Sequence, residues 1–177
     1  MTDFRSVDFS KLPVPEEDGA ADHLPGRSVP GWLPGGGETL VAFLYPATGT
    51  PGRAMPEGWD EIPGARGCTP QSCAFRDHHS ELVELGATVV GVSAQPPEEQ
   101  REFAEREGLP YELVNDSELR LADELGLPTF DVEGRRLYRR LTLIAREGRI
   151  VKVFYPVFPP DRNAADVADW LRENPAA

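Results

Sequence analysis

The chain has 177 residues, of which 40% are hydrophobic, so one domain can bury its core without help from disulfides or metals. Its 30 acidic and 18 basic residues give a formal net charge of −12, which would repel a phosphate backbone, so nucleic acid is not expected as a partner. Residues 1–20 lack an apolar core of signal-peptide length, and the longest apolar run is too short to span a bilayer. We therefore expect no membrane partner and a cytoplasmic location.

The first segment, residues 1–37, is rich in proline and glycine and contains the sequences PVP, LPG, VPG and LPGGG. Such a segment cannot hold a long helix. We predict an N-terminal arm over residues 1–37 that packs on a domain formed by residues 38–177.

The next segment, TLVAFLYP at residues 39–46, is a nearly continuous apolar run that ends at Pro46. A run of this kind is typical of a strand buried on both faces, so it is expected to be the central strand. Residues 47–67 are dense in glycine and proline and predict a long loop. Loops beyond about 15 residues in compact domains are usually functional or disordered. This loop leads directly to Cys68.

A helix is predicted from Pro70 onward, since the apolar residues between Cys73 and Leu85 share one face and Gly86 stands where a helix ends. ATVVGVS at residues 87–93 then predicts a second buried strand. A helix with prolines and acids in its first turn follows at residues 96–108.

The last third of the chain continues the alternation of strands and helices. We expect a strand, a helix capped by Ser117, two strands on either side of a Glu147-Gly148 turn, and a final amphipathic helix. Their ranges are 111–116, 117–126, 136–146, 149–156 and 163–174. This order predicts an α/β fold with a mixed central sheet flanked by helices.

The two cysteines of the chain, Cys68 and Cys73, stand five residues apart in GARGCTPQSCAFRD. A zinc site is disfavoured because structural sites usually add a second pair of ligands on a separate element. The neighbouring His78 and His79 would project about 100° apart on a helix and could not both face one ion. We expect neither a metal nor a cofactor.

The spacing also disfavours a permanent disulfide. Five residues along an α-helix separate two Cα atoms by about 8.6 Å, whereas bridged cysteines need less than about 7 Å. The thiols can therefore join only if the first turn unwinds, which suits a reaction cycle better than a structural bridge. Cys68 precedes the helix, near Arg66, and both surroundings favour a thiolate. Cys73 lies deeper and fits either a partner thiol or a small buried hydrophobic residue.

The stretch FLYPATGTPG followed by CTPQSCAFRD resembles the peroxiredoxins, and the five-residue cysteine spacing resembles their Q-type branch, the bacterioferritin comigratory proteins. The resemblance runs over roughly residues 38–173 and is most specific around the cysteines. It implies a thioredoxin-like fold.

The resemblance also implies roles for individual residues. Cys68 would attack the peroxide and become a sulfenic acid, and Cys73 would resolve it as an intramolecular disulfide that thioredoxin or a similar dithiol reduces. Arg140 stands where the family has its active-site arginine, with Arg139 as a rival. The residues expected to contact the substrate are Pro46, Gly67, Gln71 and Trp59.

One departure from the family pattern concerns the threonine that normally lies three residues before the reactive cysteine. Ala65 occupies that position here, and Glu61 stands at the position of the family's proline. The matching Pro46 and Thr50 precede an insertion at residues 53–67. Either the insertion bulges out and returns Thr50 to the pocket as a catalytic residue, or the hydroxyl is absent.

The role of the insertion can also be interpreted in two ways. Its apolar side chains could line a wall beside the thiol that admits a bulkier organic hydroperoxide, or they could only anchor a long loop. These side chains are Met55, Trp59 and Ile62.

Three functions remain open at this point. The leading one is a thiol-dependent peroxidase that reduces hydrogen peroxide or organic hydroperoxides. A thiol–disulfide oxidoreductase or small-molecule thiol oxidase on a repurposed scaffold is the second, and a non-catalytic binding module is the third. A monomer or weak homodimer is expected from the resemblance.

Overall fold

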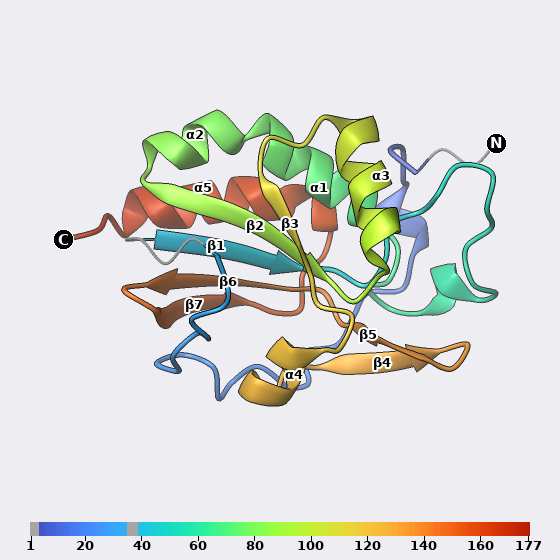
Figure 1. Ribbon diagram of the computed structural model, residues 1–177, viewed down its shortest axis with the longest axis horizontal. Coiled ribbons are helices and arrows are strands. Elements are labelled where there is room, and N and C mark those ends of the chain that lie inside the picture. The colour runs from blue at the N-terminus through green and yellow to red at the C-terminus, as the bar shows by residue number, and fades with distance from the viewer. Residues whose placement is uncertain (1–3, 35–38) are drawn as a thin grey trace.

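The computed structural model of the protein describes residues 4–34 and 39–177 (Figure 1). Its centre is a five-stranded mixed sheet in the order β3-β2-β1-β6-β7. Strand β2 runs parallel to β1 and β3 runs parallel to β2, whereas β6 and β7 are antiparallel to their neighbours. The strands are β1 (Thr39–Leu44), β2 (Ala87–Ser93), β3 (Glu112–Asn115), β6 (Leu141–Arg146) and β7 (Arg149–Phe154).

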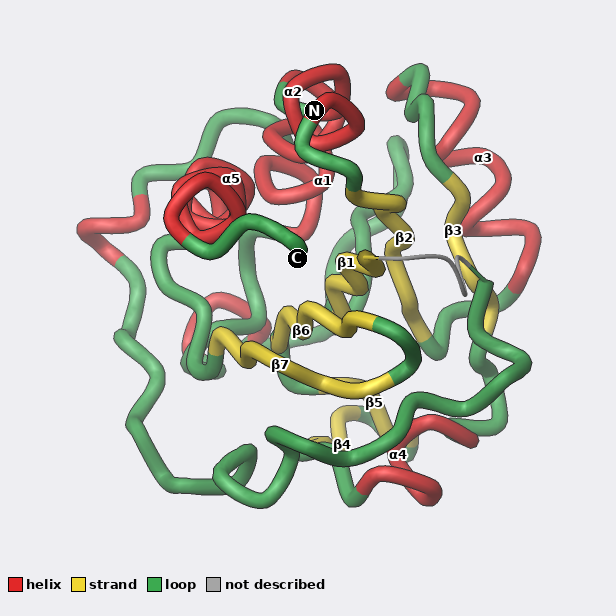
Figure 2. The backbone as a smooth tube through the Cα atoms, turned by 90° about the vertical axis from the view of Figure 1, so that its left-hand side faces the viewer, coloured by secondary structure: helices red, strands yellow, loops and turns green. Residues whose placement is uncertain are grey.

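Helices and a small hairpin cover the two faces of this sheet. The α-helices are α1 (Cys68–Asp77), α2 (His79–Glu84), α3 (Pro97–Glu107), α4 (Arg120–Leu125) and α5 (Asn163–Glu173). Short 3-10 helices occur at η1 (Phe9–Lys11), η2 (Trp59–Glu61) and η3 (Pro160–Arg162), and the hairpin is β4 (Thr129–Val132) with β5 (Arg135–Tyr138). Figure 2 shows α1, α2 and α5 on one face of the sheet and α4 with the hairpin on the other. The thioredoxin-like α/β fold with a mixed central sheet is thereby confirmed.

Strand β1 is the central strand, as predicted. Its alternating side chains enter two separate cores: Leu40, Ala42 and Leu44 pack toward α4 and the N-terminal segment. Val41 and Phe43 pack toward α1 and α5. All six residues of the strand are buried, which explains why its sequence is a continuous apolar run rather than an alternating one.

The N-terminal segment contributes to the core and covers a sheet edge. Leu24 and Leu33 are buried against the residues of β1 and α4. The backbone of Arg27 accepts a hydrogen bond from the Ile150 N–H at 2.9 Å, which satisfies part of the exposed edge of β7. The predicted boundary between arm and domain, at residues 37 and 38, lies outside the described residues, so this division stays a prediction.

Two expected helices differ in detail from those observed. The helix expected from Pro70 to Leu85 begins at Cys68 and is divided into α1 and α2 at His78. Helix α4 begins at Arg120, later than predicted, because the carboxylate of Asp116 accepts from the N–H groups of Arg120 and Leu121. The N-cap residue is Leu119, and Asp116 supplies the side-chain acceptor for the first N–H groups, so the expectation of a Ser117 cap was wrong.

The segment at residues 136–146 is two strands and not one. Its first part is β5, which pairs with β4 through Phe130 and Leu137, and its second part is β6 in the main sheet. Arg139 and Arg140 lie in the connection between these strands. Alternation along a single strand therefore does not decide which arginine points inward. The turn at Glu147-Gly148, by contrast, is confirmed, with φ of 50° and 77° as in a tight hairpin.

In the described part of the chain, no helix combines the length and the apolar character needed to cross a membrane.

Candidate active site

Gly67 fixes the position of Cys68 at the first residue of α1. Its φ of 119° is one that residues with a side chain rarely adopt. A Cβ atom there would also lie 2.8 Å from ring carbons of Phe9 and Pro160. Glycine is thus required by both conformation and packing, and it sets the direction in which the Cys68 side chain leaves the helix.

The guanidinium of Arg140 lies directly against the sulfur of Cys68. Its Nη2 is 3.2 Å from the Sγ atom, and it also donates to the carbonyl of Ala65 at 2.9 Å. The Gly64 carbonyl accepts from the Nε and Nη2 of Arg140 as well. Arg140 is 4% exposed, and the described contacts give it neutral oxygens and the sulfur rather than a carboxylate. Its positive charge is therefore directed at Cys68 from a buried position, where a charge acts more strongly than at the surface.

A chain of buried polar side chains holds Arg140 in place. Its Nη1 donates to the Oε1 of Gln71 at 2.6 Å, and the Nε2 of Gln71 donates to the Oδ1 of Asn163 at 3.1 Å. The hydroxyl of Thr142 donates to the same Asn163 oxygen at 2.6 Å. The Gln71 side chain is therefore buried against Arg140 and is not exposed on the surface of the helix. Sequence reasoning missed Asn163 and Thr142, because only the fold brings the start of α5 to β6 and α1.

A small cavity of about 20 Å³ is lined in part by Cys68. This is room for about one water-sized molecule. The expected residues Gly67 and Trp59 both line it, and the complete lining is Phe4, Ala47, Gly49, Met55, Trp59, Arg66, Gly67, Cys68 and Thr69. Phe4, from the N-terminal segment, lines it and packs so closely on Gly49 that a Cβ atom there would clash with the Phe4 ring.

The insertion at residues 53–67 both packs into an apolar cluster and lines the cavity beside Cys68. Trp59 is 3% exposed and packs in a separate cluster with Ala65 and Leu137. Trp59 and Met55 also line the Cys68 cavity, whereas Ile62 packs only in that cluster. The carbonyls at the end of the insertion, at Gly64 and Ala65, are the ones that orient Arg140.

Thr50 lies beside the cavity but does not line it. It borders an adjacent cavity of about 110 Å³, and the walls shared by the two cavities include Ala47 and Trp59. Pro46 is buried at the end of β1, where its carbonyl accepts from the Ser93 hydroxyl at 3.4 Å. Of the predicted site residues, Cys68, Gly67 and Trp59 line the cavity. Arg140 contacts the Cys68 sulfur and Gln71 contacts Arg140 without lining the cavity, and Thr50 and Pro46 do not line it either. The roles of these two residues stay predictions.

Cys73 lies on the same helix as Cys68 and has the opposite electrostatic surroundings. Both thiols are free. The Sγ of Cys73 donates to the Oε2 of Glu107 at 3.5 Å. Burial, together with the negative charge of Glu107, raises the pKa of the Cys73 thiol to about 11. Cys73 is therefore a neutral thiol in the folded protein at neutral pH.

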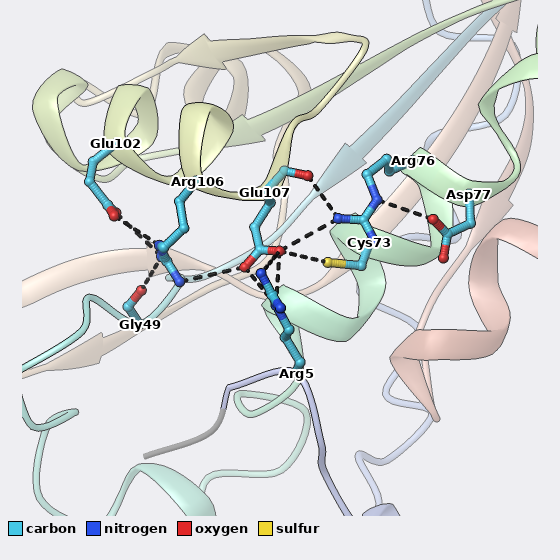
Figure 3. Close-up of polar contacts among 8 residues, drawn as sticks. All are labelled: Arg5, Gly49, Cys73, Arg76, Asp77, Glu102, Arg106 and Glu107. Carbon is cyan, nitrogen blue, oxygen red and sulfur yellow. Dashed lines mark hydrogen bonds and ion pairs between the residues drawn. The ribbon is translucent and has the colours of Figure 1, made fainter. Parts of the chain in front are cut away.

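Glu107 and the arginines around it form a second polar cluster that sequence reasoning missed (Figure 3). Its side chain is fully buried and contacts Arg5, Arg76 and Arg106. One signal was visible in the sequence: an acidic residue in the last turn of a helix, just before Gly108, opposes the helix dipole.

The histidines near the cysteines have other partners. The Nδ1 of His78 is 3.0 Å from the Glu81 carboxylate, and the ring of His79 lies beside the ring of Tyr111 in a tilted arrangement. Within the described residues, no group of three or more His, Cys, Asp or Glu side chains is placed to hold a metal ion.

Comparison with known proteins shows which family this chain resembles. The Redoxin family matches residues 35–170. The chain is 32% identical over 141 residues to peroxiredoxin Bcp of Bacillus subtilis, a match that covers 77% of this chain and 80% of that protein. It is 29% identical to the chloroplastic peroxiredoxin Q of Gentiana triflora over 77% of this chain, and it spans 55% of that protein's length.

A solved structure shows the same fold. The crystal structure of peroxidoxin BcpB from Mycobacterium tuberculosis superposes with a TM-score of 0.67 at 26% identity, over 86% of this chain and 99% of that one. Since the family match covers most of the chain and the Bacillus protein is similar over four fifths of its length, this chain belongs to the redoxin family, as a peroxiredoxin of the Q/Bcp type.

Proposed function

We propose that this chain is a thiol-dependent peroxidase that reduces hydrogen peroxide or small organic hydroperoxides. The observation that carries the proposal is the 3.2 Å contact between the Cys68 sulfur and the Arg140 guanidinium beside a water-sized cavity. A cation held at that distance stabilises a thiolate and can polarise the oxygen atoms of a bound peroxide.

In the first step, the Cys68 thiolate attacks one oxygen of the peroxide and the O–O bond breaks. The sulfur gains that oxygen and becomes a sulfenic acid, and the other oxygen leaves with a proton as water or an alcohol. Arg140 faces the reacting sulfur, and the carbonyls of Gly64 and Ala65 keep the guanidinium there. With Thr50 outside the cavity, the proposed donor to the peroxide is the Arg140 guanidinium, which the peroxide meets where it reaches the sulfur.

In the second step, the Cys73 sulfur attacks the Cys68 sulfenic acid, forming the S–S bond and releasing the hydroxyl, which leaves with the thiol proton as water. Both cysteines lie on α1, with Cys68 in its first turn. Two cysteines five residues apart in an α-helix are about 8.6 Å apart at Cα, too far for a bridge. The start of α1 must therefore unwind in this step.

A dithiol protein such as thioredoxin is proposed to complete the cycle by reducing the Cys68–Cys73 disulfide. Its two thiols become a disulfide while both cysteines of this chain are restored. A cytoplasmic location and a monomeric or weakly dimeric state belong to the same proposal.

The test is stopped-flow mixing of the reduced protein with hydrogen peroxide, followed by mass spectrometry after one equivalent. We expect fast loss of the Cys68 thiol, a disulfide in the native chain, and a trapped sulfenic acid in Cys73→Ser. A Cys68→Ser variant supplies the background rate. If Cys68 reacts no faster than free cysteine, the peroxidase proposal is wrong.

A thiol–disulfide oxidoreductase is the second candidate, and the position of Thr50 outside the Cys68 cavity is the observation that favours it. It predicts exchange with model disulfides faster than turnover with peroxide. The contact between Arg140 and Cys68 argues against a purely non-catalytic binding module, which has no use for a buried cation on a thiol. A partner pull-down that is unaffected by substituting both cysteines would favour that module.

A further inference from the structure

Glu107 has an unusual position for a carboxylate. Its side chain is fully buried, and it lies in the last turn of α3, where the helix dipole disfavours negative charge. A buried charge is costly unless it is paired and hydrogen-bonded. A residue kept at such a place needs specific partners, and Figure 3 shows them converging on its two oxygens.

The partners of Glu107 come from three different parts of the chain. The Arg5 side chain in the N-terminal segment reaches it at 3.1 Å, Arg76 of α1 at 3.5 Å and Arg106 of α3 at 3.6 Å. Arg76 also donates to the backbone carbonyl of Glu107 at 2.7 Å, which fastens α1 to the end of α3. The remaining contact of the carboxylate is the thiol of Cys73, which donates to Oε2.

The two sulfurs of α1 therefore face opposite charges. Cys68 faces the guanidinium of Arg140, and Cys73 faces the carboxylate of Glu107. We propose that Glu107 is a positioning residue that keeps Cys73 a protonated, slow-reacting thiol in the folded protein and so makes it the second cysteine to react. This role rests on the proposed peroxidase function, in which Cys68 must be oxidised first and Cys73 must stay unreacted until then.

The charges around Cys73 support this assignment. Burial raises the pKa of the thiol most, the Glu107 charge raises it further, and Arg76 and Arg5 lower it. Tyr111, which also lies near Cys73, has its own pKa raised by burial and donates its proton to the Ser72 carbonyl, so it adds no charge. With a pKa of about 11, the thiolate fraction of Cys73 at pH 7.5 is about one in three thousand.

Unwinding the start of α1 would remove this restraint in the step that needs it. Once residues 68–72 leave the helix, the Cys73 side chain is free to turn from the Glu107 carboxylate toward the sulfenic acid of Cys68. The thiol proton then leaves with the hydroxyl of the sulfenic acid as water. Glu107 slows Cys73 before this step and is not the base that removes its proton.

The test measures alkylation of Cys73 by iodoacetamide as a function of pH in a Cys68→Ser background, which needs no peroxide. Glu107→Gln should lower the pH midpoint by about one unit, because burial, the larger cause of the raised pKa, remains. The thiolate fraction at pH 7.5 would then rise about tenfold and its intrinsic nucleophilicity would fall about threefold, so alkylation should be about threefold faster. Glu102→Gln, which removes the same charge from α3 and also contacts Arg106, is the matched control and should leave the midpoint unchanged.

A second variant separates a charge effect from loosening of the structure. Arg76→Gln removes a cation that favours the thiolate, so it should slow alkylation at pH 9, whereas loosening would accelerate it in both variants. Opposite effects of Glu107→Gln and Arg76→Gln support the proposal. An unchanged midpoint in Glu107→Gln, or faster alkylation in both variants, overturns the proposal. If Glu107→Gln does not fold, the result with Arg76→Gln is used by itself: slower alkylation supports the proposal and faster alkylation overturns it. Failure of the peroxidase proposal would instead appear in the reaction of Cys68 with peroxide.

Discussion

The Nη2 atom of Arg140 lies 3.2 Å from the Sγ atom of Cys68, although 72 residues separate them in the chain. The contact depends on the connection between β5 and β6, which turns Arg140 inward, and on the carbonyls of Gly64 and Ala65 in the insertion, which accept from the same Nη2 and, at Gly64, also from Nε. Arg139, its neighbour, instead places its guanidinium 5.4 Å from the centre of the Phe130 ring.

Replacing Arg140 with lysine should slow the reaction with hydrogen peroxide by about 10²-fold or more. A lysine keeps the charge but loses the planar fork that binds Gln71, Ala65 and the sulfur together. Stopped-flow measurement of the second-order rate constant checks this. Arg139→Lys is the control and should keep the native rate, so equal losses in both variants would contradict a specific role for Arg140.

Replacing Asn163 with alanine should destabilise the protein by about 1–3 kcal/mol, because the buried donors of Gln71 and Thr142 lose their shared acceptor. The free energy of unfolding in urea measures this. Asn174→Ala, at the exposed end of α5, should cost far less. Equal effects of the two substitutions would show that the buried chain of hydrogen bonds contributes nothing particular.

Phe4 should limit the size of the hydroperoxide that reaches Cys68, because its ring lines the cavity of about 20 Å³ beside this residue. Phe4→Ala should raise the rate with cumene hydroperoxide relative to the rate with hydrogen peroxide. Val14→Ala, an exposed position in the same N-terminal segment, is the control. An unchanged ratio of the two rates in Phe4→Ala would mean that substrates reach the sulfur by another route.

Oxidation should unwind the start of α1. A bridge between Cys68 and Cys73 is incompatible with an intact helix, so backbone amides at residues 68–73 should exchange hydrogen faster in the disulfide form than in the reduced form. Hydrogen exchange followed by mass spectrometry gives this directly, with α5 as the internal reference. Equal protection of α1 in both forms would rule out local unwinding.

High pH should destabilise the reduced protein partly through Cys73. The pKa of this thiol is about 11 in the folded protein, against about 8.5 for an unfolded cysteine. The folded state therefore holds the proton more tightly. Its stabilising effect is complete below about pH 8 and is lost as pH rises toward 11. The free energy of unfolding should fall less steeply over this range in Cys73→Ser than in the native chain, and parallel curves would refute the coupling.

Much of the fold follows from short-range patterns of apolar and turn-forming residues in the sequence. The apolar run at residues 39–46 predicted the central strand because both faces of β1 are covered, and the Glu147-Gly148 turn predicted the hairpin between β6 and β7. The division of residues 136–146 was not predicted, because its first residues pair with β4 at residues 129–132, a strand that the local sequence pattern does not indicate.

The sequence by itself determined the pair of thiols and their spacing on one helix, since these depend on residue identity and on helix geometry, whereas the candidacy of Arg140 came from the resemblance to the peroxiredoxins. Only the tertiary structure decided which charge each sulfur meets. Arg140 and Glu107 come from segments 72 and 34 residues away from the cysteines they contact, and electrostatic effects depend on distance and burial rather than on order along the chain. The same holds for Phe4 and Asn163, which reach the site only because the folded sheet brings both ends of the chain to α1.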